Sequence, residues 1–333
     1  MIELHDRDIS VVIPTRNRAG RLGRCLDGLK QQTLAPERFE VVFVDNGSTD
    51  GSFELVERLA KETPFRTSVL TEPKPGPAAA RNRGVEWARG ARILFLGDDI
   101  LASPQLLAEH VAAAEKHPDD AVLGFTGWAP QLELTPFMRY LAPERGPQFR
   151  YATIRDPFDC GYQFFYTSNI SLAPHWFELE QFDEAFPYAC FEDTDLGYRL
   201  QKRGLKIVLH RPALAWHDHP IRFRDFLTRI RQMGESNVMF YYKYPELHSD
   251  PNVIPSEGYR RLDTWWRRLR MALMARWIEA ADRRGIGFGE QTYRRVLEHY
   301  FVRAFFAALD RRGHAPQNVS RDEDAPSYTK PEG

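Results

Sequence analysis

Features that define several protein classes are scarce in this 333-residue chain. It has only three cysteines, and their odd number and wide spacing fit neither a disulfide framework nor a zinc site. Such cysteines, here Cys25, Cys160 and Cys190, are typical of reduced thiols in a reducing compartment. The formal net charge of -1 excludes a strong overall attraction to nucleic acid.

Long apolar runs are also missing. No stretch approaches the ~18 apolar residues of a membrane-spanning helix, and the first residues contain no apolar signal core. We therefore expect a soluble, cytoplasmic protein, with peripheral contact at the inner face of a membrane left open. No G-x-G-x-x-G follows the first expected strand, which disfavours a nicotinamide-dependent dehydrogenase.

The chain instead alternates apolar strand patterns with helical ones. This alternation predicts an α/β fold with an open, mostly parallel central sheet flanked by helices. Ser103-Pro104 is read as the N-cap and first residue of a helix that runs to about Lys116. A C-terminal helical region and a disordered tail at 314–333 follow. Strands are expected at 9–13, 39–44, 67–70, 92–96, 121–126, 164–172 and 206–216, and late helices at 222–242, 259–284 and 290–312.

Polar clusters follow three of the expected strands, at 14–18, 45–50 and 97–99. Ligands of such sheets gather beyond the carboxyl ends of the strands, so these clusters are expected to meet in one crevice. The third cluster contains two adjacent carboxylates, Asp98 and Asp99. Buried side by side they require a cation, and Mg²⁺ or Mn²⁺ carried with a phosphate-bearing substrate is the usual one. A simple turn and helix cap is the other interpretation.

A second acidic pair, Glu192-Asp193, stands at the start of an expected helix. A positioned carboxylate of this kind can take the proton from an attacking hydroxyl. Acidic residues also complement the N-terminus of a helix without any catalytic role.

Five motifs in order, at 11–18, 44–50, 76–84, 95–99 and 192–200, resemble the inverting glycosyltransferases of family 2, which have the GT-A fold. The resemblance covers roughly residues 8 to 220. It implies a GT-A domain at 1–219, with a nucleotide-binding half at about 1–100 and an acceptor half at 101–219. The helical region at 220–313 lies outside the shared core.

The resemblance also implies roles for individual residues. Asp45 would accept an N–H of the base, which suits uracil, thymine or guanine alike. Arg81 would meet the base or a phosphate, and Asp98 the hydroxyls of the sugar or ribose. The complete donor-binding set is Pro14, Thr15, Arg16, Asp45, Arg81, Asp98 and Asn169.

A divalent metal, Mn²⁺ or Mg²⁺, is the implied cofactor. Asp99 would bind it directly, with His217 as a further ligand and His219 in reserve. The family's Asp-X-Asp motif is incomplete here, because Gly97 occupies its first acidic position. Asp193 would be the catalytic base, and Glu192 would orient the acceptor or the metal shell.

The implied reaction moves a sugar from a nucleotide diphosphate sugar to a hydroxyl of a saccharide, lipid-linked or other acceptor. Synthesis of a bacterial surface polysaccharide or glycoconjugate is the expected context. One alternative is a sugar-phosphate nucleotidylyltransferase, but the Gly-rich, Lys-bearing loop expected after its first strand is replaced by 14–17, Pro-Thr-Arg-Asn. A non-catalytic nucleotide-sugar-binding module is the other, and the two retained acidic pairs argue against it.

The expected helix near 262–277 has apolar residues on one face and many arginines elsewhere. A basic amphipathic helix can lie on an anionic membrane. Packing of this face against the catalytic domain or a partner protein is the expected arrangement. The apolar face comprises Leu262, Trp266, Leu269, Leu273 and Trp277.

Overall fold

The computed structural model describes residues 7–313 apart from 143, 145, 187, 251–252 and 257, and for Arg261 only the backbone. The tail predicted to be disordered, 314–333, lies outside the described residues.

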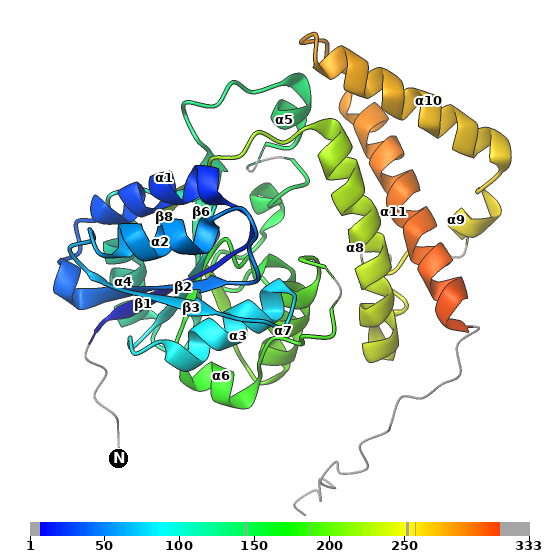
Figure 1. Ribbon diagram of the computed structural model, residues 1–333. Helices are drawn as coiled ribbons and strands as arrows, with labels where there is room; N and C mark the ends of the chain where they lie inside the picture. The colour runs from blue at the N-terminus through cyan, green and yellow to red at the C-terminus, as the bar shows by residue number, and fades with distance from the viewer. Residues whose placement is uncertain are drawn as a thin grey trace, which may run out of the picture.

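An eight-stranded sheet in the order β3-β2-β1-β4-β7-β6-β8-β5 forms the centre of the described molecule (Figure 1). Six strands run in one direction and only β5 and β7 oppose them, which confirms the prediction of a mostly parallel sheet. The strands are β1 Ile9–Thr15, β2 Phe39–Asp45, β3 Arg66–Thr71, β4 Ile93–Leu96, β5 Ile100–Ala102, β6 Ala121–Trp128, β7 Asn169–Leu172 and β8 Ile207–His217.

Helices cover both faces of this sheet. Alternate residues of a strand point to opposite faces, so Val11 packs in one apolar cluster and Val12 in the other. The Val11 face is covered by α1 Ala19–Lys30, α2 Ser52–Ala60 and α4 Leu106–Lys116. The Val12 face is covered by α3 Pro77–Trp87, α6 His175–Leu179 and α7 Glu192–Lys202. Burial on both faces explains why β1, β2 and β4 are nearly all apolar.

Gly84 allows α3 to approach the sheet closely. A Cβ at this position would overlap the side chain of Val12 and press against Val44. Any larger residue would push α3 away from β1 and β2. The close approach matters for the site, because α3 also carries Arg81.

Two boundary predictions were wrong. The expected strand at 164–172 begins only at Asn169, because Phe164 and Phe165 turn into the core ahead of it. The helix expected to start at Ser103-Pro104 begins at Leu106. Ser103 lies in a preceding turn, where its N–H donates to Leu214 O and its carbonyl accepts from the Gln32 side chain.

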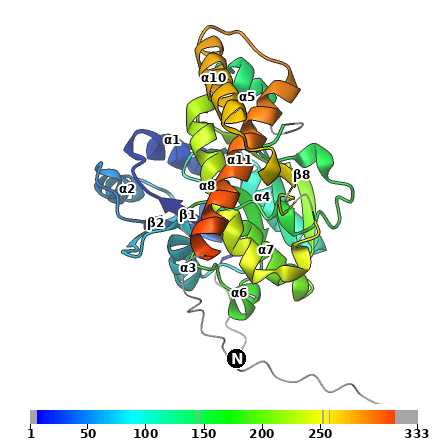
Figure 2. The same ribbon diagram turned by 90° about the vertical axis from the view of Figure 1, so that its right-hand side faces the viewer.

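Four helices complete the described chain: α8 Phe223–Lys243, α9 Gly258–Arg261, α10 Trp265–Asp282 and α11 Glu290–Gly313. The single helix expected at 259–284 is divided at Asp263-Thr264, where the Thr264 hydroxyl caps α10 by accepting from Arg267 N. In Figure 2, α8 and α11 lie side by side, with α10 beside the short helix α5 Pro136–Tyr140. None of the described helices is long and apolar enough to cross a bilayer.

Candidate active site

A cavity of about 670 Å³ lies beyond the carboxyl ends of β1 and β4. This volume is in the range of small-molecule sites. The cavity brings together residues far apart in the chain, as the polar clusters predicted. Of the predicted site residues, its wall contains Pro14, Thr15, Arg16, Arg81, Asp98, Asp99, Glu192, Asp193 and His217.

Asp45 ends β2 beside this cavity. Its Oδ2 accepts from the backbone N–H groups of Gly47 and Ser48, at 3.2 and 3.1 Å. Its Oδ1 is buried and has no partner among the described residues. A buried carboxylate oxygen of this kind is suited to accept an N–H from a ligand.

Asn46, which the sequence analysis missed, lines the cavity next to Asp45. Its Nδ2 donates to the carbonyls of Glu72 and Lys74, and its Oδ1 accepts from Gly76 N at 2.7 Å. It therefore fixes the loop that leads from β3 into α3. Its position in the turn after Asp45 was the available signal.

Asp98 is held from two sides. Thr15 Oγ1 donates to its Oδ2 at 2.9 Å, and Arg18 Nε lies 3.5 Å from its Oδ1. Burial, followed by the charge of Asp99, raises the pKa of Asp98 to about 6. Arg18 lies in the first motif but was not among the predicted site residues.

Asp99 and His217 meet because β5 pairs antiparallel with β8. That register sets Ile100 opposite His217, and Asp218 N donates to Asp99 O at 2.8 Å. His217 Nε2 then lies 3.6 Å from Asp99 Oδ2. Burial would raise the pKa of Asp99, but the charges of Arg18 and of His217, which is protonated in the acidic range where Asp99 titrates, outweigh it and hold that pKa below its usual value.

The protonation states of Asp99, His217 and His219 suit a metal site. Burial lowers the pKa of His217, and it lowers the pKa of His219 to about 4, so both imidazoles are neutral at pH 7. A neutral imidazole and an ionised carboxylate are both metal ligands. No group of three or more metal-binding side chains occurs within the described residues. Mg²⁺ needs only one or two protein carboxylates when a substrate phosphate completes its shell, so Asp99 fits, and the imidazole of His217 would suit Mn²⁺.

Arg81 forms a buried ion pair with Glu192. Its Nη1 lies 2.7 Å from Glu192 Oε1, and its guanidinium stacks over the Phe182 ring at 5.4 Å. Arg81 Nε and Glu192 Oε2 have no partner in the described part of the chain. Arg81 was predicted to meet the base or a phosphate, and here it positions Glu192. Burial, together with the charge of Asp193, raises the pKa of Glu192.

Asp193 stands in the first turn of α7. The residue before the helix, Phe191, has a φ of +72°. This backbone conformation is unfavourable for a bulky side chain, and residues that adopt it are concentrated at functional sites. Asp193 Oδ1 accepts from Thr194 N at 2.8 Å. Burial raises the pKa of Asp193. A carboxylate with a raised pKa that faces a cavity has the properties of a general base.

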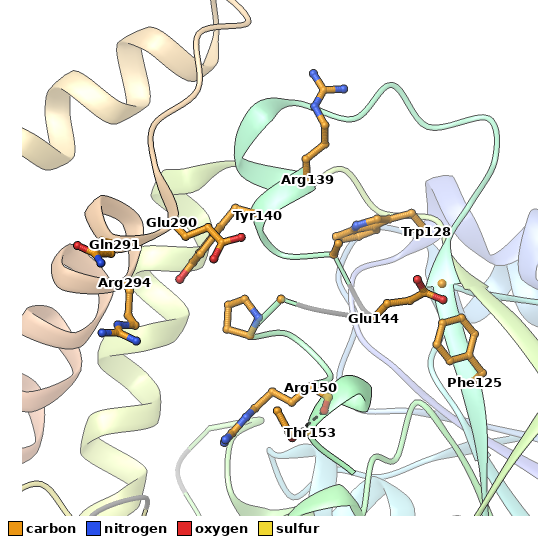
Figure 3. Close-up of a pocket in the computed structure, with 14 residues that line it drawn as sticks. Phe125, Trp128, Arg139, Tyr140, Glu144, Arg150, Thr153, Glu290, Gln291 and Arg294 are labelled. Atoms are coloured by element: carbon orange, nitrogen blue, oxygen red, sulfur yellow. Dashed lines mark hydrogen bonds between the residues drawn. The ribbon is translucent and has the colours of Figure 1, made fainter. Parts of the chain in front are cut away.

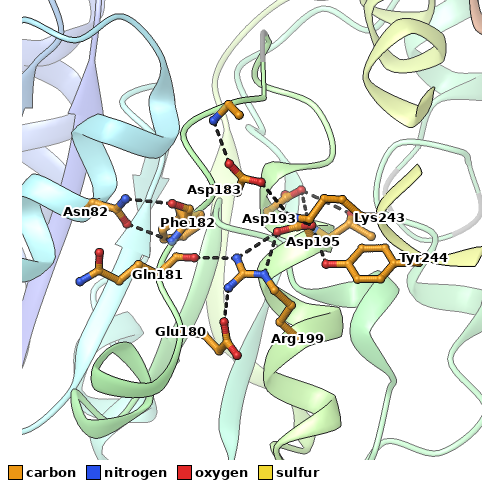
Figure 4. A network of polar contacts seen from close by, with 12 residues as sticks. Asn82, Glu180, Gln181, Phe182, Asp183, Asp193, Asp195, Arg199, Lys243 and Tyr244 are labelled. Atoms are coloured by element: carbon orange, nitrogen blue, oxygen red, sulfur yellow. Dashed lines mark hydrogen bonds and ion pairs between the residues drawn. The ribbon is translucent and has the colours of Figure 1, made fainter. Parts of the chain in front are cut away.

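The start of α7 is anchored to the end of α8 through Asp195 (Figure 4). This fully buried carboxylate accepts from Lys243 Nζ at 2.6 Å, from Tyr244 Oη at 2.7 Å and from Arg199 at 2.9 Å. Lys243 also pairs with Asp183 at 2.7 Å. Because Asp195 is two residues from Asp193, this network fixes the position of the acidic pair. The sequence analysis did not identify it.

Asn169 does not reach the cavity wall, which corrects its expected place in the sugar pocket. It is fully buried at the start of β7, with Oδ1 2.8 Å from His110 Nε2 and Nδ2 donating to Ala213 O at 2.9 Å. A Cβ at Gly124 would overlap this amide. Asn169 therefore joins β7 to α4 and β8.

Asn169→Ala is accordingly expected to lower stability and leave donor binding intact. The substitution leaves a buried carbonyl and a ring nitrogen unpaired, which costs about 3 kcal/mol of the free energy of unfolding. Urea unfolding measures this loss. The control is Ser168→Ala, which changes the preceding residue, itself on the cavity wall. A variant with normal stability and weakened nucleotide binding would restore the original prediction.

Two further cavities continue from the first one. A cavity of about 580 Å³ shares Gln148 and Arg229 with it and shares Arg150 and Arg294 with a third cavity of about 760 Å³. Figure 3 shows this third cavity between α11, which carries Arg294, and the loop of Arg150, with Trp128 on the β6 side. Within the described residues, neither Arg150 nor Arg294 has an acidic partner. We call these three adjoining cavities the cavity tract, and its outer part is lined by arginines together with Glu144, Glu290 and Glu298.

The sequence is similar to those of known glycosyltransferases. Residues 10–171 match the family described as glycosyl transferase family 2. A validoxylamine A glucosyltransferase of Streptomyces hygroscopicus subsp. limoneus is 34% identical over an alignment of 263 positions, which covers 72% of this chain and 57% of that protein. A PGL/p-HBAD biosynthesis glycosyltransferase of Mycobacterium tuberculosis is 39% identical over 117 residues, 34% of this chain and 45% of that protein. The chain thus spans less than two thirds of the length of these relatives.

Solved structures share the fold. The mannosyltransferase PcManGT from Pyrobaculum calidifontis, in complex with GDP-Man and Mn²⁺, gives a TM-score of 0.62 at 18% identity, covering 90% of this chain and 86% of that one. S. aureus TarS 1-349 in complex with UDP gives a TM-score of 0.53 at 16% identity, and the alignment covers 93% of each chain. These similarities confirm the predicted GT-A fold.

Proposed function

Through residues 10–171 this chain belongs to glycosyl transferase family 2, as its motifs predicted, and from that premise we propose that it transfers a sugar from a nucleotide diphosphate sugar to an acceptor hydroxyl. The observation that supports this most is the single cavity that joins the Asp98-Asp99 pair to the Glu192-Asp193 pair. A donor-binding module alone has no need of a half-buried carboxylate with a raised pKa, such as Asp193, in the same cavity as the donor side.

On the donor side, Asp45 accepts an N–H of the base through its free Oδ1, and the 14–16 loop contacts the nucleoside. Asp98, fixed by Thr15 and Arg18, accepts from hydroxyls of the ribose or sugar. Asp99 and His217 would hold a divalent metal, which supplies charge stabilisation for the departing diphosphate when bound. The Mn²⁺ in the PcManGT complex supports this cofactor.

On the acceptor side, Asp193 takes the proton from the attacking hydroxyl. The freed oxygen forms a bond to the anomeric carbon as the bond from that carbon to the diphosphate oxygen breaks, so the configuration inverts. The nucleoside diphosphate leaves with the electron pair of the broken bond. Arg81 holds Glu192 beside this reaction, where it orients the acceptor.

We propose that the acceptor enters along the cavity tract that passes Arg229. This route accommodates a saccharide or a lipid-linked acceptor in the synthesis of a surface polysaccharide or glycoconjugate. The three free, buried cysteines suit a reducing compartment, and the cytoplasm is the proposed place of action.

Thermal stabilisation by donors tests the proposal. UDP-, GDP- and dTDP-sugars are added with and without Mn²⁺, and the melting temperature of the native-state complex is followed. We expect one nucleotide class to stabilise the protein and Mn²⁺ to increase the effect. If no nucleotide sugar raised the melting temperature, the proposed function would be wrong.

Asp45→Asn tests the base contact in the same assay. The asparagine amide has one oxygen in place of two. That oxygen can accept from the N–H groups of Gly47 and Ser48 or from the base, and it cannot do both well. We expect about tenfold weaker nucleotide binding, the equivalent of one hydrogen bond to a charged group. The exposed Asp159→Asn is the control. Unchanged affinity in Asp45→Asn would remove Asp45 from the donor site.

A further inference from the structure

The outer face of α10 is apolar and uncovered. Seven of the eleven large apolar side chains exposed in the described part of the chain fall between residues 262 and 286. Trp266, Leu273 and Trp277 are 64%, 57% and 61% exposed. The interpretation in which this face packs against the catalytic domain is therefore wrong.

The geometry of α10 explains how both of its sides are apolar. A helix turns about 100° per residue, so Trp266, Leu273 and Trp277 lie on one side, and Met271 and Ile278 lie on the other. Met271 and Ile278 are buried in the cluster that also contains residues of α8 and α11. Figure 1 shows α10 at the edge of the helical region, with α8 and α11 between it and the sheet. The exposed side faces away from α8 and α11, and only Trp277 at its end contacts a residue outside α10, the Phe288 ring at 5.1 Å, among the ring contacts of the described residues.

Basic residues border this exposed side. Arg270 flanks it on one edge and Arg276 on the other, at about 60° or less from the apolar stripe by helical geometry. Both are exposed, and within the described residues neither has an acidic partner. The acidic groups nearby are already engaged: Glu279 with Arg283, and Asp282 with the backbone N–H of Phe137.

We propose that this face of α10 docks the protein on the surface of an anionic lipid bilayer. Tryptophan and leucine with an arginine on each edge match an interface that is apolar inside and negatively charged at its headgroups. Tryptophan is the side chain most suited to the headgroup level of a membrane. A second copy of the chain would offer the same arginines to each other, so charge complementarity favours the lipid surface.

Vesicle sedimentation of the full chain tests this docking. The vesicles contain phosphatidylcholine alone or phosphatidylcholine mixed with phosphatidylglycerol. We expect the protein to sediment with the mixed vesicles, less so at high salt, and to remain in solution with phosphatidylcholine alone. Tryptophan emission should shift to shorter wavelength on binding and be quenched by brominated lipid.

Two variants locate the contact. Trp266→Ser with Trp277→Ser should lose binding to the mixed vesicles, and Arg270→Gln with Arg276→Gln should weaken it about fivefold for each arginine removed. Leu179→Ser with Phe158→Ser removes side chains that are equally exposed on other elements and should bind like the wild type. Circular dichroism and donor binding verify that each variant is folded.

Two results would overturn the proposal. In the first, the wild-type protein remains in solution with both kinds of vesicle. In the second, light scattering shows a dimer that Trp266→Ser with Trp277→Ser dissociates, while the mixed vesicles bind wild type and variant equally. That second result would identify the face as a contact between copies of the chain.

Discussion

Asp193→Asn is expected to lower kcat by about 10³-fold, within the range for loss of a general base. The amide has nearly the shape of the carboxylate and can keep its contact to Thr194 N, so the start of α7 should stay in place. Donor binding should be nearly unchanged, because the proposed role of Asp193 is to act on the acceptor. Steady-state kinetics with the donor found by thermal stabilisation measure kcat. Calorimetric titration of that donor measures its affinity.

The pH profile gives an independent test of the same role. Burial raises the pKa of Asp193, and the group must be ionised to accept a proton. Activity should therefore fall as the pH drops through this raised pKa, at a pH above the ordinary aspartate value of about 3.9. The exposed Asp159→Asn is the control and should show the wild-type profile. Wild-type turnover in Asp193→Asn would mean that another group is the base.

Asp99→Asn is expected to lower activity at least about 100-fold, because the metal proposed to bind there would contribute several kcal/mol to stabilisation of the leaving group. Removal of the charge also leaves His217 without its acidic neighbour. The increase in melting temperature that Mn²⁺ adds to nucleotide binding should disappear. His217→Ala should show a smaller loss of the same kind.

Chelation and a remote substitution complete this test. EDTA should abolish wild-type activity, and Mn²⁺ or Mg²⁺ should restore it. Asp119→Asn, an exposed carboxylate at the far end of the sheet, should retain full metal dependence. If Asp99→Asn kept Mn²⁺-dependent stabilisation, the metal ligand would have to be sought elsewhere in the cavity.

The parts of the site that could be predicted were those set by local pattern. Apolar runs identify β1, β2 and β4, and parallel strands bring their carboxyl ends together, so the convergence of Thr15, Asp45 and Asp98 follows from the strand order. The start of α7 at Glu192 was also predictable, since acidic residues precede a clear helical pattern.

The remaining parts depend on pairings over long separations. The three-residue strand β5 has no periodic signal, yet its register with β8 brings Asp99 to His217. Asn169 resembles a sugar-pocket residue in sequence, and only the packing of His110 and Gly124 against it reveals a core amide. The apolar stripe of α10 predicted a packed face, because periodicity shows that a face exists and not what covers it.

The anchor at Asp195 limits how the chain can be divided or recombined. A fragment that ends at residue 219 would lack Lys243 and Tyr244 and leave a fully buried carboxylate short of two of its three partners. Loss of a partner from a buried charge costs about 3–5 kcal/mol, a large part of the stability of a typical domain. The central sheet and the C-terminal helices are therefore not interchangeable modules. A chimera that exchanges the helices must bring its own lysine and tyrosine to the end of α8, or the proposed base will lose its fixed position.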